Sequence, residues 1–168
     1  MAFVGFVAGC GPREPPLVNP GMSTVNRLGG GPWTAAADGG PAPDPGIDLP
    51  SVRPVGKPFV SKGHFAGRWN AEVAVNETAR STYMNLGASS RFAVGSLLVK
   101  RHAAASGPGP IFAMAKRDPG FFPEGGDWEY VVIDATGRLE ERGKLAVCAR
   151  CHAEANADSI FGVPLEAR

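Results

Sequence analysis

Short runs in which apolar and polar residues alternate make up much of the chain after residue 58. In one of them Ala71, Val73 and Val75 fall on one face of an extended backbone, while Asn70, Glu72 and Ala74 fall on the other. A period of two residues predicts a half-buried strand. Strands are predicted at Trp69–Val75, Val94–His102, Ile111–Lys116 and Trp128–Asp134, of which the last is richest in β-branched and aromatic residues.

Two segments between and after these runs favour helices. Asn76 is a good N-cap for a helix over Glu77–Leu86, and Gly87 is a typical stop signal. Lys144 to Ala155 contains neither Pro nor Gly and predicts a second helix near the C-terminus. Several strands with a few helices predict an α+β fold, built mainly on an antiparallel sheet.

Composition divides the chain of 168 residues into two parts. Residues 1–58 hold 11 Gly and 11 Pro, whereas residues 59–168 hold 12 Gly and 5 Pro. Pro removes backbone hydrogen-bond donors, and Gly raises the entropy that the backbone loses on folding. Residues 11–58 are therefore expected to form a disordered, flexible linker. A short helix over Ser23–Leu28 is possible within it and would stop at the following glycines. Residues 59–168 are the expected folding unit, of a normal size for one core.

Charge and hydropathy each argue against one class of protein. The net charge is +1, and residues 59–168 carry 13 Lys and Arg against 12 Asp and Glu. A basic surface for nucleic acid is therefore not expected. No apolar run approaches the length of a membrane-spanning helix.

The sharpest motif in the chain is Cys148-Ala-Arg-Cys151-His152. This C-x-x-C-H spacing is typical of covalent c-type haem attachment. Cysteines at i and i+3 lie on one face of a helix, so two thioethers can hold one porphyrin and the adjacent histidine can bind the iron as proximal ligand. One covalent haem c is the predicted cofactor.

Other interpretations of the motif fit less well. A thioredoxin-like redox pair follows a strand in a βαβ unit, whereas this motif follows a helix-like run. A structural zinc site needs a second ligand pair, and His64 and His102 are far apart in the sequence. A motif without any cofactor is the remaining alternative.

The first ten residues end in Ala-Gly-Cys10 after a short apolar run. They resemble the end of a bacterial lipoprotein signal, although no Lys or Arg precedes Cys10. Covalent haem attachment takes place outside the bacterial cytoplasm, which agrees with export. Lipidation of Cys10 and a periplasmic or cell-envelope location, tethered to a membrane, are therefore expected. An ordinary N-terminus bearing a thiol is the alternative.

The layout differs from that of small helical electron-transfer cytochromes, in which the motif comes early and a methionine ligand follows it. Here the motif lies near the C-terminus and no Met follows it. If the protein were a plain electron carrier, a sixth iron ligand would have to come from Met84, Met114, His64 or His102.

Five segments, in this order and spacing, resemble the cytochrome P-460 and cytochrome c-prime-beta family: Val94–Lys100, Phe112–Lys116, Gly126–Tyr130, Cys148–His152 and Asp158–Phe161. The resemblance covers about residues 65–163. It implies a mainly antiparallel sheet that carries the haem, a homodimer, and a five-coordinate iron with an open distal pocket. It also implies that Lys100 matches the lysine that is crosslinked to the haem in the P-460 branch.

The resemblance further suggests the chemistry of the distal pocket. It places Phe112, Ala71 and Met114 there, and Phe112 and Ala71 stand where hydroxylamine-oxidising members carry an acidic residue and an arginine. A carboxylate can accept protons from substrate, and Phe112 cannot. The predicted function is binding or redox conversion of nitric oxide or hydroxylamine, with an enzyme, a plain electron carrier and a gas sensor all left open.

Several further residues have weaker assignments. Trp128, Tyr130 and Phe161 are expected to pack near the haem, with ordinary sheet packing as the alternative for the first two. Arg91 and Arg150 are candidate partners of the haem propionates or plain surface residues. His64 and His102 are expected on the surface, with distal ligation of the haem iron as the alternative. A soluble periplasmic electron-transfer protein is the expected redox partner.

Overall fold

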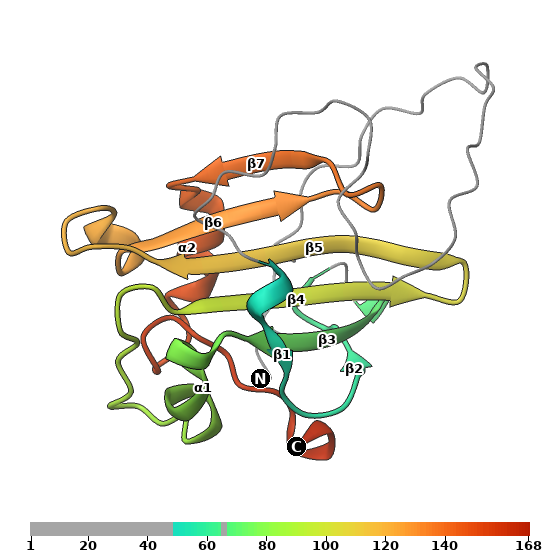
Figure 1. Cartoon of the computed structure of the whole chain (residues 1–168), viewed down its shortest axis with the longest axis horizontal. Coiled ribbons are helices and arrows are strands. Elements are labelled where there is room, and N and C mark those ends of the chain that lie inside the picture. Colours follow the sequence, from blue (N-terminus) through green and yellow to red (C-terminus); the bar gives the residue numbers. More distant parts are fainter. Residues whose placement is uncertain (1–48, 65–66) are drawn as a thin grey trace, which may run out of the picture.

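The computed structural model describes residues 49–64 and 67–168. Seven strands of the described residues form one antiparallel sheet (Figure 1). They are β1 (Arg53–Pro54), β2 (Phe59–Val60), β3 (Asn70–Val75), β4 (Leu97–Ala104), β5 (Gly107–Lys116), β6 (Trp128–Ile133) and β7 (Leu139–Gly143). The helices are α1 (Glu77–Met84) and α2 (Ala146–His152), with 3-10 turns η1 (Leu49–Ser51), η3 (Pro123–Gly125) and η4 (Leu165–Ala167). The predicted α+β class with a mainly antiparallel sheet is confirmed.

From β2 to β7 the sheet is a meander in which chain neighbours pair, and β1 joins it by pairing with β3. Its order is β1-β3-β4-β5-β6-β7, and β2 pairs with β3 beside β1. In the central hairpin Lys100 of β4 lies opposite Phe112 of β5, and Phe112 lies opposite Val132 of β6. Because facing residues in an antiparallel pair project to the same side, this register fixes which side chains gather above the sheet.

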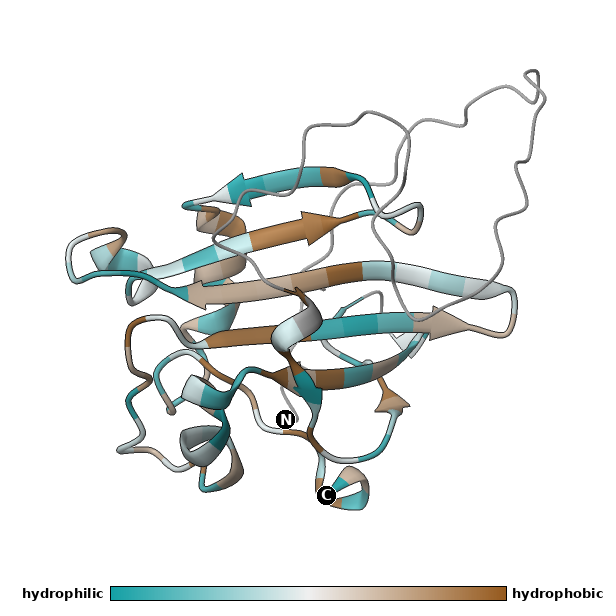
Figure 2. Ribbon diagram, in the orientation of Figure 1, coloured by the Kyte–Doolittle hydropathy of each residue, from teal (hydrophilic) through white to brown (hydrophobic). Residues whose placement is uncertain are grey.

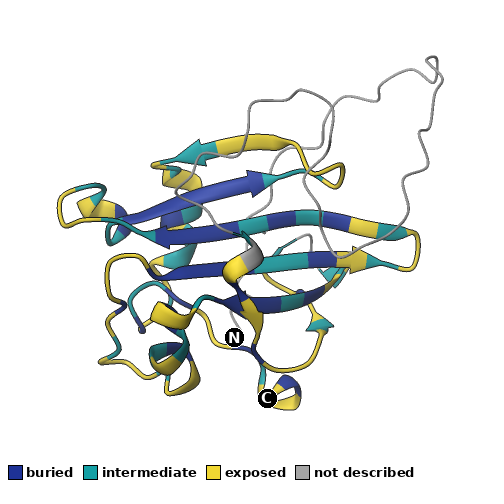
Figure 3. Ribbon diagram, in the orientation of Figure 1, coloured by how far each residue is buried: buried dark blue, intermediate teal, exposed yellow. Residues whose placement is uncertain are grey.

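The two faces of the sheet carry separate cores. The face that packs against α1, α2 and the C-terminal segment, called the helix-covered face here, includes Val73, Leu98, Met114, Trp128 and Tyr130. On the opposite face Val52 and Leu49 pack over a second cluster of Ala74, Leu97, Val99, Ile111, Ala113, Ala115 and Val131. Figure 2 shows the apolar central strands, and Figure 3 shows that β6 is buried along most of its length while β7 is exposed.

The first helix begins as predicted and ends earlier. The Oδ1 atom of Asn76 accepts a hydrogen bond from the backbone N–H of Ala79 at 3.1 Å, so the predicted N-cap is confirmed. The same oxygen accepts from Leu97 N–H at 3.0 Å, which ties the helix start to β4. The helix ends at Met84, before the predicted Leu86, because Asn85 leaves helical geometry and its side chain bonds back to Ser81 O.

Other element boundaries also differ from the sequence pattern. Residue 94 lies outside β4, because Gly95 has φ of 85° and turns the chain before the strand begins. Helix α2 is shorter than the predicted Lys144–Ala155 segment. The edge strand β7 was not predicted, because its largely exposed sequence lacks an apolar alternation.

The folded part also begins before residue 59, the boundary predicted from composition. Val55 is 3 % exposed, and β1 pairs with the end of β3. Gly56 packs its backbone against Ala167, since an added Cβ would lie 2.3 Å from the Ala167 carbonyl oxygen. The last residues of the predicted linker therefore belong to the core, because tertiary contacts outweigh their poor intrinsic propensity.

Glu129 of β6 is a buried charge on the face opposite the helices. Its carboxylate accepts hydrogen bonds from Arg117 Nε and from Arg142 Nε, each at 2.7 Å. Burial raises the pKa of Glu129, but the hydrogen bonds from Arg142 and Arg117 outweigh it and hold the pKa below its usual value. The Glu129 carboxylate on β6 therefore links Arg142 on β7 to Arg117 in the loop after β5.

Replacing Glu129 with Gln should lower the free energy of unfolding by about 1–3 kcal/mol, because two partly buried guanidinium groups lose their counterion. The wild-type carboxylate stabilises the fold above its unfolded-state pKa and loses that contribution as the pH falls through its lower folded-state pKa. The difference between variant and wild type should therefore shrink in acid. Urea denaturation at several pH values measures it, with the exposed Glu140→Gln as control; equal effects of the two substitutions would contradict the expectation.

Candidate functional site

The helix-covered face of the sheet brings the sequence-predicted site residues together. Lys100 lies opposite Val73 of β3 and Phe112 of β5, and Met114 lies opposite Tyr130 of β6. Strand alternation places Ala71 on this same face, because it lies two residues before Val73. Helix α2 packs on this face through Ala149 and Cys148.

His152, the last residue of α2, has a defined hydrogen bond. Its Nδ1 lies 2.8 Å from the carbonyl oxygen of Ser159. A carbonyl only accepts, so Nδ1 carries the proton and the lone pair is on Nε2. Nε2 makes no hydrogen bond to the described residues. The imidazole lies beside the rings of Tyr130 and Phe161, with ring centroids 5.7 and 5.5 Å away.

The Ser159 carbonyl is held by an unusual turn. Asp158 and Ser159 have φ of 53° and 64°, in the left-handed region that non-glycine residues rarely adopt. The Asp158 carboxylate accepts from Lys116 Nζ at 2.8 Å, and its backbone carbonyl accepts from Trp128 Nε1 at 2.8 Å. These contacts from β5 and β6 compensate the strained backbone and fix the group that orients His152.

The turn also accounts for a role that the sequence analysis missed. The sequence analysis gave Asp158 no contact of its own, whereas its carboxylate pairs with Lys116 and accepts a hydrogen bond from Phe92 N–H at 2.9 Å. Trp128 is fully buried and contacts Phe92, at 5.5 Å between ring centroids. The sequence analysis could not find this link, because a sequence alone does not show which opposite charges far apart in the chain form a pair.

Lys100 presents a buried amine on the helix-covered face. Burial lowers the pKa of Lys100 to about 8. Its Nζ lies 5.5 Å from the ring centroid of Phe59. Burial lowers the pKa of His152 against the opposing hydrogen bond to Ser159 O, and the charge of Lys100 adds a smaller lowering, so the imidazole is biased toward its neutral form. Strand alternation turns Lys100 to the same face as Leu98, where Val73 and Phe112 lie opposite it on the neighbouring strands.

His64 and His102 do not lie on the surface, contrary to the sequence-based expectation. His102 is 1 % exposed; its Nδ1 lies 2.9 Å from Pro110 O and its Nε2 3.2 Å from Ser61 Oγ. The ring of His64 lies 4.4 Å from that of Phe112, and its Nδ1 is buried without a hydrogen-bond partner among the described residues. The strand pattern could not show this, because the loop containing His64 folds back over the sheet.

The three histidines share one environment. Burial lowers the pKa of His64 to about 3, with Lys100, His102 and His152 adding smaller effects of the same sign. Burial, followed by the charge of Lys100, lowers the pKa of His102 to about 4, against the opposing hydrogen bond to Pro110. These imidazoles are therefore neutral at physiological pH, which is the form that binds metals.

The motif cysteines both lie on α2. Cys148 is half-buried against the core of the helix-covered face, and burial, followed by the charge of Glu141, raises the pKa of its thiol. Cys151 is half-buried, three residues further along the helix. Cys10, the predicted lipidation site, lies outside the described residues, as does the predicted helix at 23–28.

The remaining candidate residues from the sequence analysis differ in their exposure to solvent. Arg91 and Arg150 are exposed. Met84 is 60 % exposed on α1. Phe161 is exposed but contacts His152, and the hydroxyl of Tyr130 is buried without a partner among the described residues.

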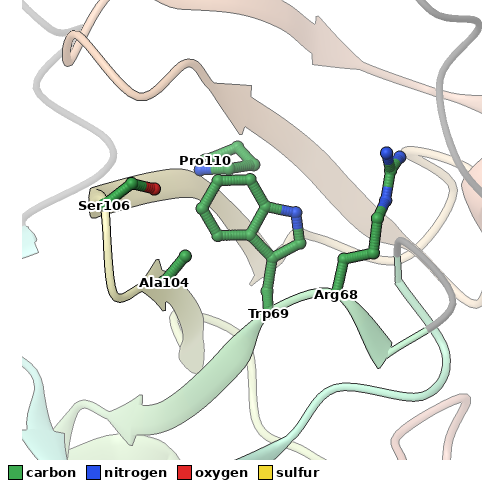
Figure 4. Close-up of a pocket in the computed structure, with 5 residues that line it drawn as sticks. All are labelled: Arg68, Trp69, Ala104, Ser106 and Pro110. Carbon is green, nitrogen blue, oxygen red and sulfur yellow. The ribbon is translucent and has the colours of Figure 1, made fainter.

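Two surface hollows are lined by residues of the described chain. One, of about 280 Å³, lies at the far end of the β4–β5 hairpin and is lined by Arg68, Trp69, Ala104, Ser106 and Pro110 (Figure 4). The other, of about 350 Å³, lies between η3 and the outer side of α2, and Phe122 and Arg150 are among its lining residues. Neither hollow is lined by His152.

The described residues contain no group of three or more His, Cys, Asp or Glu side chains that could hold a metal ion. In the same residues, neither helix combines the length and apolar character needed to cross a membrane.

Asp158→Asn should lower the free energy of unfolding by about 1–3 kcal/mol, because Lys116 loses its charged partner in a partly buried site. Asn tolerates the left-handed backbone as Asp does, so the substitution tests the charge rather than the turn. Thermal or urea denaturation measures the loss. The exposed Asp118→Asn is the control and should change stability by less than about 0.5 kcal/mol; an equally small effect at Asp158 would contradict the role of the ion pair.

Comparison with known proteins does not assign the chain to a family. No family model matches the sequence, and none of the curated proteins is significantly similar to it.

Proposed function

We propose that the protein is a covalent c-type haem protein, with Cys148 and Cys151 as thioether anchors and His152 as the proximal iron ligand. The observation that carries the proposal is the hydrogen bond from His152 Nδ1–H to Ser159 O. Histidines that bind metals usually donate the other ring N–H to a carbonyl or carboxylate, which fixes the tautomer and orients the ring. His152 has this arrangement, and its Nε2 is left for iron.

The surroundings of His152 suit a porphyrin. Tyr130 and Phe161 flank the imidazole, and Phe112 lies on the same face of the sheet. The buried hydroxyl of Tyr130 has no partner among the described residues, and a buried polar group of this kind calls for an explanation. A haem with polar propionates and an apolar ring would cover these side chains and supply a redox-active, ligand-binding iron.

The distal residues favour a small neutral ligand over acid–base chemistry. The three predicted distal positions, Ala71, Phe112 and Met114, are uncharged, and Lys100 is the charged group beside them on the face. Oxidation of hydroxylamine with proton removal needs an acceptor within hydrogen-bond reach. The function that we propose is therefore binding or redox conversion of nitric oxide, with hydroxylamine as a poorer substrate.

The first test is covalent attachment. The full chain, produced with a c-type haem maturation system, should keep its haem after denaturation in acidified acetone, as read from the pyridine haemochrome spectrum and the intact mass. Nitric oxide should then shift the Soret band of the reduced protein. The double variant Cys148→Ser, Cys151→Ser should lose the covalent haem, because both thioether bonds are removed.

Cys10→Ser is the matched control for this test, since it removes a thiol outside the motif and should leave haem attachment unchanged. A wild-type chain that folds but carries no covalent haem would overturn the proposal. Equal haem content in the double variant would do the same.

Lys100 allows a second test of the P-460-like arrangement. We propose that its Nζ bonds to a meso carbon of the haem; one hydrogen leaves each atom, and two electrons pass to an oxidant of the peroxide class. Burial lowers the pKa of Lys100 to about 8, so the reactive neutral amine is populated at mildly alkaline pH. Peptide mapping of the haem protein should find the Lys100 segment bonded to the haem peptide.

The chain offers its own control for the crosslink. Lys116 lies on the same face but is paired with Asp158, so its peptide should have the unmodified mass. Lys100→Arg should give a haem peptide with the motif segment alone. Recovery of an unmodified Lys100 peptide from wild-type haem protein would remove the crosslink from the proposal.

A further inference from the structure

The ring of His64 lies close to that of His152, the proposed proximal ligand, and is tilted by 44° from it. The ring centroids of His64 and His152 lie 6.5 Å apart. Metal–nitrogen bonds to histidine are about 2 Å long, and the ring centroid lies roughly 1 Å beyond the nitrogen, so two imidazoles on opposite sides of one metal ion have centroids about 6 Å apart. The observed separation therefore suits one iron atom between the two rings.

We infer that His64 is the sixth ligand of the iron in the resting protein, and that an incoming diatomic ligand must displace it. This inference rests on the proposed function, because it needs a haem bound to His152. It departs from the permanently open distal site that the family resemblance implies. It makes the binding of small ligands a competition with a side chain of the protein itself.

The other side chains considered as sixth ligands are less suitable. His102 already uses both ring nitrogens, through Pro110 O and Ser61 Oγ. Met84 is exposed on α1, away from the motif. Met114 is buried within the core of the helix-covered face, where its strand pairs with that of Tyr130.

His64 is held in place by its neighbours. Its ring lies against Phe112, with centroids 4.4 Å apart and planes tilted by 37°. Ser61, three residues before His64, is fully buried. Its backbone N–H donates to Trp69 O at 2.8 Å, and its hydroxyl is hydrogen-bonded to His102 Nε2. The predicted distal residue Phe112 thus acts as a positioning residue for His64.

The unpartnered nitrogen of His64 supports the same assignment. Its Nδ1 is buried without a hydrogen-bond partner among the described residues. A buried polar atom left unpaired costs free energy, and native proteins rarely tolerate one without a function. Coordination engages an imidazole nitrogen without requiring a further protein donor or acceptor.

A displaceable ligand lowers the apparent affinity for external ligands. The apparent dissociation constant equals the intrinsic one divided by the fraction of iron that is free of His64. If His64 occupies the iron for more than about nine-tenths of the time, its removal should tighten carbon monoxide binding to the reduced protein by at least about tenfold.

The test uses the full-length haem protein and spectroscopy rather than turnover. Wild type should be low-spin in its absorption and electron paramagnetic resonance spectra, as expected for two axial imidazoles. His64→Ala should be high-spin, should return to low-spin on addition of free imidazole, and should bind carbon monoxide at least about tenfold more tightly. His64→Phe should be high-spin as well, since it fills the space without supplying a ligand.

A matched variant separates the loss of His64 from a general effect of substitution. Met84→Leu should stay low-spin, because Met84 is 60 % exposed on α1 and lies outside the proposed site. Circular dichroism and haem content check that each variant is folded and loaded. A low-spin His64→Ala protein, or loss of the low-spin signal in Met84→Leu, would overturn the assignment to His64.

Failure of the inference can be told apart from failure of the proposed function. Wild-type protein with covalent haem that is already high-spin would overturn the role of His64 and leave the haem assignment standing. Wild-type protein without covalent haem in the acidified-acetone test would overturn both.

Discussion

The arrangement of the site depends on the turn formed by Asp158 and Ser159. Its backbone lies in a region that costs free energy for residues with side chains, and it persists because Lys116 and Trp128 bind it from β5 and β6. The turn presents the Ser159 carbonyl to His152. One strained segment therefore connects the sheet to the end of α2 and sets the tautomer of the histidine in the motif.

The second constraint is the burial of positive and titratable groups on one face of the sheet. Lys100, His64, His102 and His152 are close enough to influence one another, and burial lowers the pKa of each of them. Keeping four such groups in a plain hydrophobic core costs free energy. We interpret the cluster as the lining of a ligand site, in which neutral imidazoles and an activated amine face the bound group.

Local patterns predicted much of the sheet. The alternation at 69–75 gave β3 and the correct inward face, and the β-branched run after Trp128 gave β6. The Asn76 cap located the start of α1. The pattern failed for β7, β1 and β2, because short or solvent-exposed strands owe their conformation to pairing partners rather than to their own residues.

The sequence by itself determined the α+β class, the strands of the central sheet and the motif whose spacing places two cysteines and a histidine on one short helix. Those features depend on near neighbours along the chain. Tertiary structure alone decided that Asp158 pairs with Lys116, that His102 is buried, and that His64 lies across from His152. The Asp158–Lys116 pair joins residues 42 positions apart, and the hydroxyl that meets His102 belongs to Ser61, 41 positions away. No local periodicity encodes such contacts.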